Sequence, residues 1–149
     1  EGHYESENYY DINHISGDVD FSLLNLNKLA DVDGEGCYNI TLSFNGNNEE
    51  FLFDTGCSSM LINYEFLQKL KSNGVQIKQL NNSSGRTASN EEVLMNQVII
   101  NNIRVGEFTL NNLVVGVIEG GSLLCGMGLF KKFSNVEWDM NSETLKLYK

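Results

Sequence analysis

Histidine is almost absent from this chain: its two copies are His3 and His14, and residues 36–149 contain none. A zinc protease needs histidine among its metal ligands, and a serine hydrolase needs a histidine base beside its nucleophile. A phosphate-binding glycine loop followed by lysine is missing as well. These absences argue against all three classes, and we expect no bound metal and no cofactor.

Basic residues are also scarce, with ten Lys and Arg against twenty Asp and Glu, for a net charge of −10. Most of this acidity lies in residues 1–35, whose net charge is −8, while residues 36–149 carry only −2. Nucleic acids and anionic membrane surfaces both require a positive face, so we expect neither as a partner. No run approaches the roughly 18 apolar residues of a membrane span, and we expect no direct span in this chain.

Cysteine occurs three times, at Cys37, Cys57 and Cys125, without a C-x-x-C spacing. An odd number in this pattern signals neither a disulfide framework nor a zinc knuckle, and it leaves their redox state and the compartment open. Hydrophobic residues make up 41% of the 149 residues. That is enough for one globular domain with a substantial core.

The chain divides by composition into an acidic N-terminal extension, residues 1–35, and a body, residues 36–149. The extension is rich in Tyr and Asn and holds one apolar patch, residues 21–26. Two interpretations stay open for it: a segment packed on the body or on a neighbouring molecule, or a floppy tail.

The body shows the signals of short strands. Residues 38–44 alternate, Asn45-Gly46 favours a tight turn, and residues 50–53 return, which predicts a β-hairpin running into Asp54. A strand at 60–62 follows, and Asn63 is the expected N-cap of a helix over 64–71.

Further strands are predicted at 75–80, 92–101, 107–110, 113–118, 136–139 and 144–148, with a brief strand and a short helix over 123–133. Asparagine pairs at 101–102 and 111–112 mark turns. Strands this frequent predict a mostly β fold with two short helices, in which the sheet closes or folds over into a barrel.

Residues 51–59, FLFDTGCSS, carry the motif with the most specific chemistry. A hydrophobic strand that delivers Asp54-Thr55-Gly56 resembles the active-site signature of retropepsin-like aspartic proteases, including the single-domain bacterial ones. The helix after it and the element Leu123-Leu124-x-Gly126 follow in the family's order, so the resemblance covers roughly residues 36–149. It implies an acid-protease fold and an aspartic endopeptidase.

In that family two aspartates act together, and this chain has one such motif. The resemblance therefore implies a homodimer in which each subunit supplies Asp54 as its catalytic carboxylate. Thr55 and Gly56 would support it: Thr55 by a hydrogen bond to the partner's loop, and Gly56 by allowing a tight turn whose amide reaches the carboxylate. A polypeptide is the implied substrate.

Cys57 departs from the family pattern, which usually has Ala or Ser at this place. A thiol is a weak donor, so a hydrogen bond that Ser would give the carboxylate is weakened, and the pH optimum is open. A second interpretation makes Cys57 a nucleophile, although no histidine of the body is there to activate it.

A flap over the substrate is expected from the resemblance at residues 81–90, with Gly85 near its tip and Ser84, Gly85 and Arg86 as substrate contacts. A plain surface loop is the alternative. The element at 123–126 is expected to buttress the catalytic loop, although Cys125 adds one residue before Gly126 and leaves its register open.

Two rival functions remain for the sequence. One is a catalytically silent dimeric peptide-binding module of the same fold, and the other is a β-rich adhesion or ligand-binding domain in which the Asp-Thr-Gly motif is a coincidence. Residues 1–35 are a candidate pro-segment, inhibitory strand or dimer arm. The family resemblance suggests an extracytoplasmic bacterial location, periplasmic or secreted, while substrate specificity cannot be derived.

Overall fold

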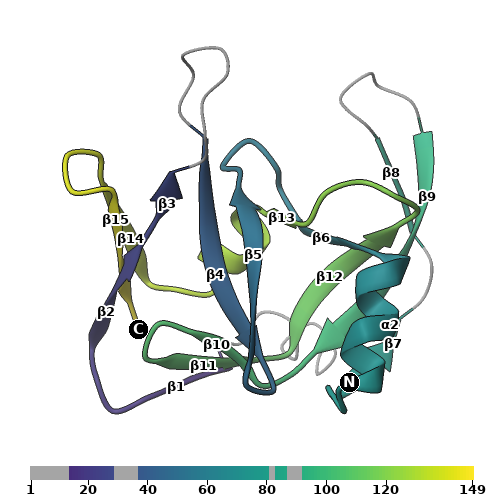
Figure 1. The fold of residues 1–149 in the computed structure, drawn as a ribbon, viewed down its shortest axis with the longest axis horizontal. Helices are drawn as coiled ribbons and strands as arrows, with labels where there is room; N and C mark the ends of the chain where they lie inside the picture. The colour runs from purple at the N-terminus through teal and green to yellow at the C-terminus, as the bar shows by residue number, and fades with distance from the viewer. Residues whose placement is uncertain (1–13, 29–36, 81–82, 87–91) are drawn as a thin grey trace, which may run out of the picture.

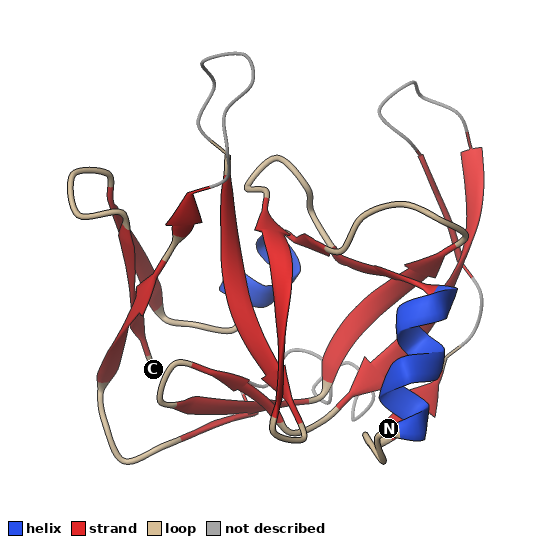
Figure 2. Ribbon diagram, viewed as in Figure 1, coloured by secondary structure: helices blue, strands red, loops and turns tan. Residues whose placement is uncertain are grey.

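The computed structural model describes residues 14–28, 37–80, 83–86 and 92–149. In this part of the chain the fold is mostly β, with helices α2 (Tyr64–Ser72) and α3 (Met127–Phe130). Figure 2 shows strands curling through most of the molecule, α2 standing at one side, and α3 behind β5 in this view. The predicted fold class, a folded-over β structure with two short helices, is confirmed for the described residues.

Two sheets form the described structure, and the larger one has twelve strands. Its main path runs β1-β11-β10-β4-β5-β13-β6-β12-β9-β7, with β3 added beside β4 and β8 beside β9. The strands are β1 (His14–Ser16), β3 (Asn27–Lys28), β4 (Tyr38–Phe44), β5 (Asn47–Phe53), β6 (Met60–Asn63), β7 (Ile77–Gln79), β8 (Ser83–Arg86), β9 (Glu92–Ile100), β10 (Ile103–Val105), β11 (Phe108–Asn111), β12 (Leu113–Ile118) and β13 (Leu124–Cys125).

The smaller sheet brings the two ends of the described chain together. It has the order β14-β15-β2, from β2 (Phe21–Asn25), β14 (Asn135–Asp139) and β15 (Thr144–Tyr148). Strand β2 pairs antiparallel with β15, so that Leu24 lies opposite Leu145. Figure 1 shows this sheet at the edge away from α2.

The first hairpin folds as its turn residues require. Asn45 and Gly46 have φ angles of 52° and 88°, and Phe44 lies directly opposite Asn47. Positive φ at both turn positions matches the twist of a two-residue hairpin, and Asn-Gly adopts it at the lowest cost. The turn thereby fixes the register of β5, the strand that ends next to Asp54.

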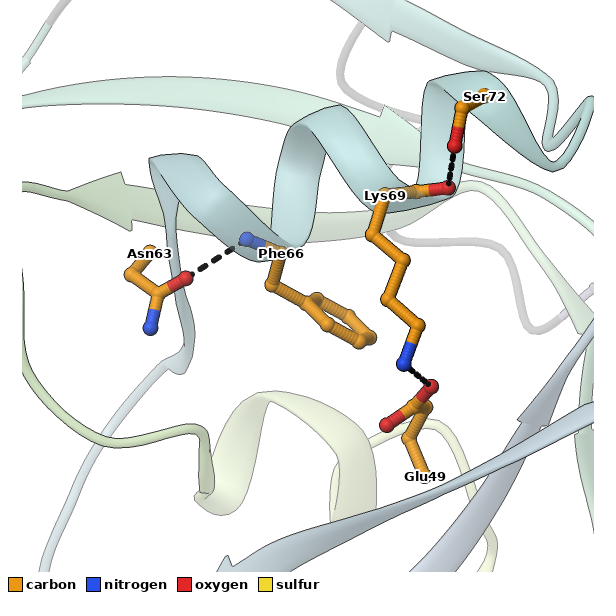
Figure 3. Close-up of polar contacts among 5 residues, drawn as sticks. All are labelled: Glu49, Asn63, Phe66, Lys69 and Ser72. Atoms are coloured by element: carbon orange, nitrogen blue, oxygen red, sulfur yellow. Dashed lines mark hydrogen bonds and ion pairs between the residues drawn. The ribbon is translucent and has the colours of Figure 1, made fainter.

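Helix α2 begins at the predicted cap. The Asn63 side-chain oxygen accepts a hydrogen bond from the Phe66 backbone N–H at 2.8 Å (Figure 3). Phe66, Leu67 and Leu70 are buried beneath the helix. The Phe66 ring packs edge-to-face on Phe44 and Phe51, with centroids 5.6 and 5.7 Å apart, which fixes the helix against the first hairpin.

Part of the N-terminal extension is built into both sheets. Strand β1 pairs with β11, β2 with β15 and β3 with β4, and the Leu26 side chain is only 6% exposed. The Ser22 hydroxyl accepts a hydrogen bond from the Glu107 backbone N–H at 3.1 Å. Residues 14–28 therefore pack on the body, as the first of the two interpretations expected, while residues 1–13 lie outside the described residues.

Several strands differ from those predicted. The segment at 75–80 is extended only over Ile77–Gln79, and the strand expected at 107–110 covers Phe108–Asn111. Strands β1, β2 and β3 of the extension, and β8 and β10 of the body, were not predicted. Short β10 lies directly between two turns, and the polar residues of β8 give no hydrophobic alternation to recognise.

Candidate active site

Asp54 follows the last residue of β5 and opens a tight loop. The Gly56 backbone N–H donates to the Asp54 Oδ1 at 3.0 Å, as expected, and the Cys57 N–H donates to the Asp54 carbonyl at 3.2 Å. The Asp54 side chain is half-buried, while Thr55 and Gly56 are exposed. The Gly56 amide thus binds one oxygen of the Asp54 carboxylate, and the carboxylate stays accessible.

A distant element fixes this loop from behind. Strand β13 lies between β5 and β6, parallel to the first and antiparallel to the second. The Asp54 N–H donates to the Cys125 carbonyl at 3.0 Å, and the Met127 N–H donates to the Cys57 carbonyl at 2.8 Å. Both ends of the Asp54–Cys57 turn are therefore bound to residues 125–127, the buttress that the resemblance implied.

The register of this buttress is set by β5 on one side and β6 on the other. Leu124 lies opposite both Leu52 and Leu61, and Cys125 lies opposite Phe53 and Met60. The Cys125 side chain is 0% exposed. Leu124 and Cys125 are thus the two paired residues before Gly126, and Cys125 serves as a core residue.

Gly126 stands where only a glycine fits. A Cβ atom at this position would lie 2.3 Å from the carbonyl oxygens of both Cys57 and Ser59. No rotamer relieves such a clash, because Cβ is fixed by the backbone and both obstacles are backbone atoms. The close approach of Gly126 to the loop that carries Asp54 therefore depends on the absence of a side chain.

The two thiols near the loop have different environments. Cys57 is half-buried and donates a hydrogen bond to the Ser59 carbonyl at 3.3 Å. Burial raises the pKa of the Cys125 thiol, and the neighbouring Cys57 adds to the rise. Cys125 is thus a neutral core group, whereas the Cys57 thiol donates to the backbone of its own loop.

Aromatic rings support the strand residue next to Asp54. The Phe53 ring packs edge-to-face on Phe130 and on Trp138, with centroids 5.4 and 5.2 Å apart. The Tyr38 ring also packs edge-to-face with Trp138, with centroids 6.2 Å apart. The end of β5 thereby packs against both α3 and the hairpin of β14 and β15.

Three leucines form one row across the sheet near the end of β5, and none of them was predicted as a site residue. Leu52 lies two residues before Asp54, and side chains two apart in a strand share a face. Leu124 pairs with Leu52 on one side and with Leu61 on the other, and all three are only partly buried. The alternation along β5 could have indicated that Leu52 lies on the same face as Asp54. Its neighbours Leu61 on β6 and Leu124 on β13 can be identified only from the folded sheet.

The expected flap is a hairpin of β8 and β9. Ser84, Gly85 and Arg86 lie within β8, opposite Leu94, Val93 and Glu92. Gly85 is therefore part of a paired strand and not the tip that the sequence suggested. The connection at residues 87–91 lies outside the described residues, and the substrate contacts of Ser84, Gly85 and Arg86 stay a prediction.

A shallow hollow of about 360 Å³ lies beside α2, lined by Asn63, Glu65, Phe66, Lys69 and Leu123. Close to it, Lys69 Nζ lies 2.6 Å from Glu49 Oε2 (Figure 3). None of the lining residues belongs to the Asp54 loop, so this hollow is not part of the candidate active site. Among the described residues no group of three His, Cys, Asp or Glu side chains is placed to hold a metal ion.

The curled sheet, the Asp-Thr-Gly loop and the glycine element behind it define a retropepsin-like aspartic protease fold. The sequence matches the Aspartyl protease family over residues 40–129, and the chain belongs to that family. The resemblance seen in the sequence is thereby confirmed. In the described part of the chain, no helix has the length and apolar character needed to cross a membrane.

A solved structure with the same fold is that of a retropepsin-like aspartic protease from Rickettsia conorii. It matches with a TM-score of 0.57 and 22% sequence identity, over 89% of this chain and 93% of that chain. At this identity the likeness shows the fold. A comparison with curated protein sequences finds no match.

Proposed function

We propose that the chain is an aspartic endopeptidase that is active as a homodimer, with one Asp54 from each subunit. The observation that carries the proposal is the accessible Asp54 carboxylate, held by the Gly56 amide and fixed from behind by Cys125. Membership of the aspartyl protease family supports it. One such loop per chain is half of a two-carboxylate site, and a two-fold axis completes it.

The proposed chemistry needs a base and an acid at the same bond. One carboxylate takes a proton from water as the water attacks the peptide carbonyl, and the other donates a proton to the amide nitrogen. Two carboxyl groups a few Å apart share one proton, because like charges so close resist double ionisation. Aspartic proteases are a standard example of this coupling. No covalent intermediate and no cofactor takes part.

Thr55 is the proposed link between the two loops. Its side chain is exposed at the rim of the site. A hydroxyl there has the reach to bond the partner's loop and hold the two carboxylates coplanar. Replacing Thr55 with Val would then weaken the dimer while leaving the single subunit folded.

An extended polypeptide is the proposed substrate. The β8–β9 hairpin would offer backbone groups to a peptide in the extended form, as sheet edges do. Leu52, Leu61 and Leu124 supply an apolar surface on the Asp54 side of the sheet. We expect hydrophobic side chains next to the cleaved bond to fill it.

The decisive experiment compares wild type with Asp54→Asn in the cleavage of casein between pH 3 and 8, with and without a statine-type inhibitor. We expect the substitution to lower the rate at least about a hundredfold, because a group that transfers protons is lost. A Cys57→Ala variant serves as the control and should cleave, since the thiol is not the nucleophile. Cleavage that survives Asp54→Asn would overturn the proposal, and no cleavage by wild type would favour the silent peptide-binding module.

Mixing the two proteins tests the dimer. If each site needs two copies of Asp54, an equal amount of Asp54→Asn, added under exchange conditions, should lower the activity per wild-type chain to about half. The same amount of serum albumin is the control. Activity per wild-type chain that does not change on mixing would show that one subunit suffices.

The boundary at residue 36 and a regulatory role for residues 1–35 also belong to this proposal. Because strands β1–β3 are integral to the sheets, deleting residues 1–35 would remove the core residue Leu26 and would leave β11, β15 and β4 without these pairing strands. Deleting residues 1–13 alone is the better test. If that deletion changes neither activity nor dimerisation at any pH, residues 1–13 have no part in regulation.

A further inference from the structure

Asparagine is followed by glycine at two places in the chain, Asn45-Gly46 and Asn73-Gly74. Such pairs lose ammonia without an enzyme, because glycine has no side chain to keep its backbone nitrogen away from the asparagine side chain. The nitrogen bonds to the asparagine Cγ, the bond from Cγ to the amide nitrogen breaks, and ammonia leaves. Water then opens the resulting succinimide ring to aspartate or isoaspartate. The two sites share this chemistry, so the fold decides which of them reacts.

The turn that holds Asn45 is closed by the strands on both sides. Asn45 and Gly46 adopt φ angles of 52° and 88°, and Phe44 lies directly opposite Asn47. The Phe44 side chain is only 2% exposed. Rotating the peptide plane between Asn45 and Gly46 would open this turn and disturb the pairing of β4 with β5. The fold therefore opposes ring closure at Asn45.

Asn73 lies at the end of α2, where the structure is more open. Asn73 and Gly74 are both exposed, and the Asn73 side chain makes no hydrogen bond to any of the described residues. At the Asn73 ψ of 8° the Gly74 nitrogen points away from that side chain, so the peptide plane between the two residues must rotate before ring closure. Exposed helix ends open locally more easily than paired strands over a core. Ring closure is therefore easier at Asn73 than at Asn45.

One hydrogen bond joins the two sites. Asn45 Nδ2 donates to the Asn73 carbonyl oxygen at 2.8 Å. That oxygen belongs to the peptide plane that must rotate, and the Gly74 N–H of the same plane donates to the Lys71 carbonyl at 3.1 Å. A Cβ atom placed on Gly74 would lie 3.6 Å from the same Asn45 Nδ2. The Asn45 side chain thus holds the Asn73–Gly74 plane in its unreactive orientation.

We propose that Asn73 is the residue at which the folded protein deamidates first, and that the Asn45 side chain slows this reaction. Aspartate at this position places a negative charge beside the last carbonyl groups of α2, where the basic residues Lys69 and Lys71 suit the helix dipole and an acid opposes it. Isoaspartate lengthens the main chain and moves the carbonyl that Asn45 binds. Either product loosens the contact between α2 and the first hairpin. The inference does not depend on the proposed function.

Peptide mapping of the full chain after incubation at pH 8 tests the site. Trypsin releases residues 72–78, SNGVQIK, which contain Asn73, while Asn45 lies in a separate peptide, residues 29–69. Peptide 72–78 should be the first to show the mass of a carboxyl in place of an amide, in two chromatographic forms. In concentrated urea the two sites should react at similar rates. Modification of Asn45 in the folded protein as fast as that of Asn73, or none at Asn73, would overturn the assignment.

Two substitutions test the restraint by Asn45. Asn45→Gly and Asn45→Asp remove the donor and keep a turn sequence that accepts positive φ. In both variants Asn73 should deamidate about 3- to 10-fold faster, the range expected for one lost hydrogen bond. Asn48→Ala is the matched control, because Asn48 is an exposed asparagine of the same hairpin, and it should leave the rate unchanged.

The turn between β14 and β15 separates the restraint from a general loss of stability. It contains Asn141 followed by serine, a second kind of site that deamidates when the chain opens. Its rate should be the same in wild type and in both Asn45 variants. An equal acceleration at Asn141 and Asn73, or an unchanged rate at Asn73 in both variants, would overturn the restraint.

Discussion

The backbone N–H of Asp54 donates to the carbonyl oxygen of Cys125 at 3.0 Å, which joins the proposed catalytic residue to an element far along the chain. The bond continues the parallel pairing of β5 with β13 by one more rung. Because Gly126 follows at once and touches the loop, the position of the carboxylate depends on the fit of residues 124–127.

Replacing Gly126 with Ala should therefore destabilise the protein by about 3 kcal/mol or more, since the new Cβ would lie 2.3 Å from two backbone oxygens. Urea unfolding measures the change. Gly120→Ala is the control: its φ of +69° strains an alanine, but no atom lies within 4 Å, so we expect a cost of about 1 kcal/mol. Equal costs for the two variants would contradict the close approach.

The three thiols should react in the order of their exposure. Cys37 is exposed, Cys57 is half-buried and Cys125 is buried, with the Cys125 pKa raised by its burial. Since the thiolate is the reactive form, Cys125 should react with Ellman's reagent at neutral pH only after unfolding. Cys125→Ala should remove that late-reacting thiol and no other. Rapid labelling of Cys125 in the folded protein would show that the buttress opens.

Asn63→Ala should lower the free energy of unfolding by about 1 to 2 kcal/mol, because the helix loses its cap and Gly121 loses a donor. Lys69→Ala is the comparison on the same helix. Its side chain is 53% exposed, and such ion pairs contribute less than about 1 kcal/mol. A larger loss for Lys69→Ala than for Asn63→Ala in urea unfolding would contradict this order.

The turn between β14 and β15 should weaken in acid. Hydrogen bonds from the Ser142 and Asn141 backbone N–H groups lower the pKa of Asp139. A carboxyl whose pKa is lower in the folded state stabilises the protein above its ordinary pKa, near 4, and this contribution is lost as the pH falls through the folded value. Between pH 5 and 2 the unfolding midpoint should therefore fall more steeply in wild type than in Asp139→Asn. Parallel profiles would show that Asp139 contributes nothing.

Much of the local structure could be predicted because it depends on neighbours in the chain. The Asn45-Gly46 turn, the Asn63 cap and the strand Leu113–Ile118 all follow from residues within a few positions. The same holds for Asp54 as the candidate catalytic residue, since a hydrophobic strand and a tight glycine turn surround it in sequence.

The contacts that position the candidate site join segments far apart in the sequence, so local patterns could not predict them. Polar β8 is a strand because its backbone pairs with β9, and no apolar side chain announces that pairing. The apolar patch at residues 21–26 could be recognised in the sequence. The strand with which it pairs, β15, lies at the other end of the chain and could not be. Likewise, Leu61 and Leu124 form one row with Leu52 only because β13 lies between β5 and β6.

The sequence by itself determined the family, the mostly β class and the one carboxylate per chain, because turn chemistry, alternation and a contiguous motif are local properties. Only the tertiary structure decided that Cys125 is a core residue, that Gly126 has no room for a side chain, and that the Asp54 N–H bonds the Cys125 carbonyl. These are pairings between distant segments, and their geometry is fixed by strand register and close packing.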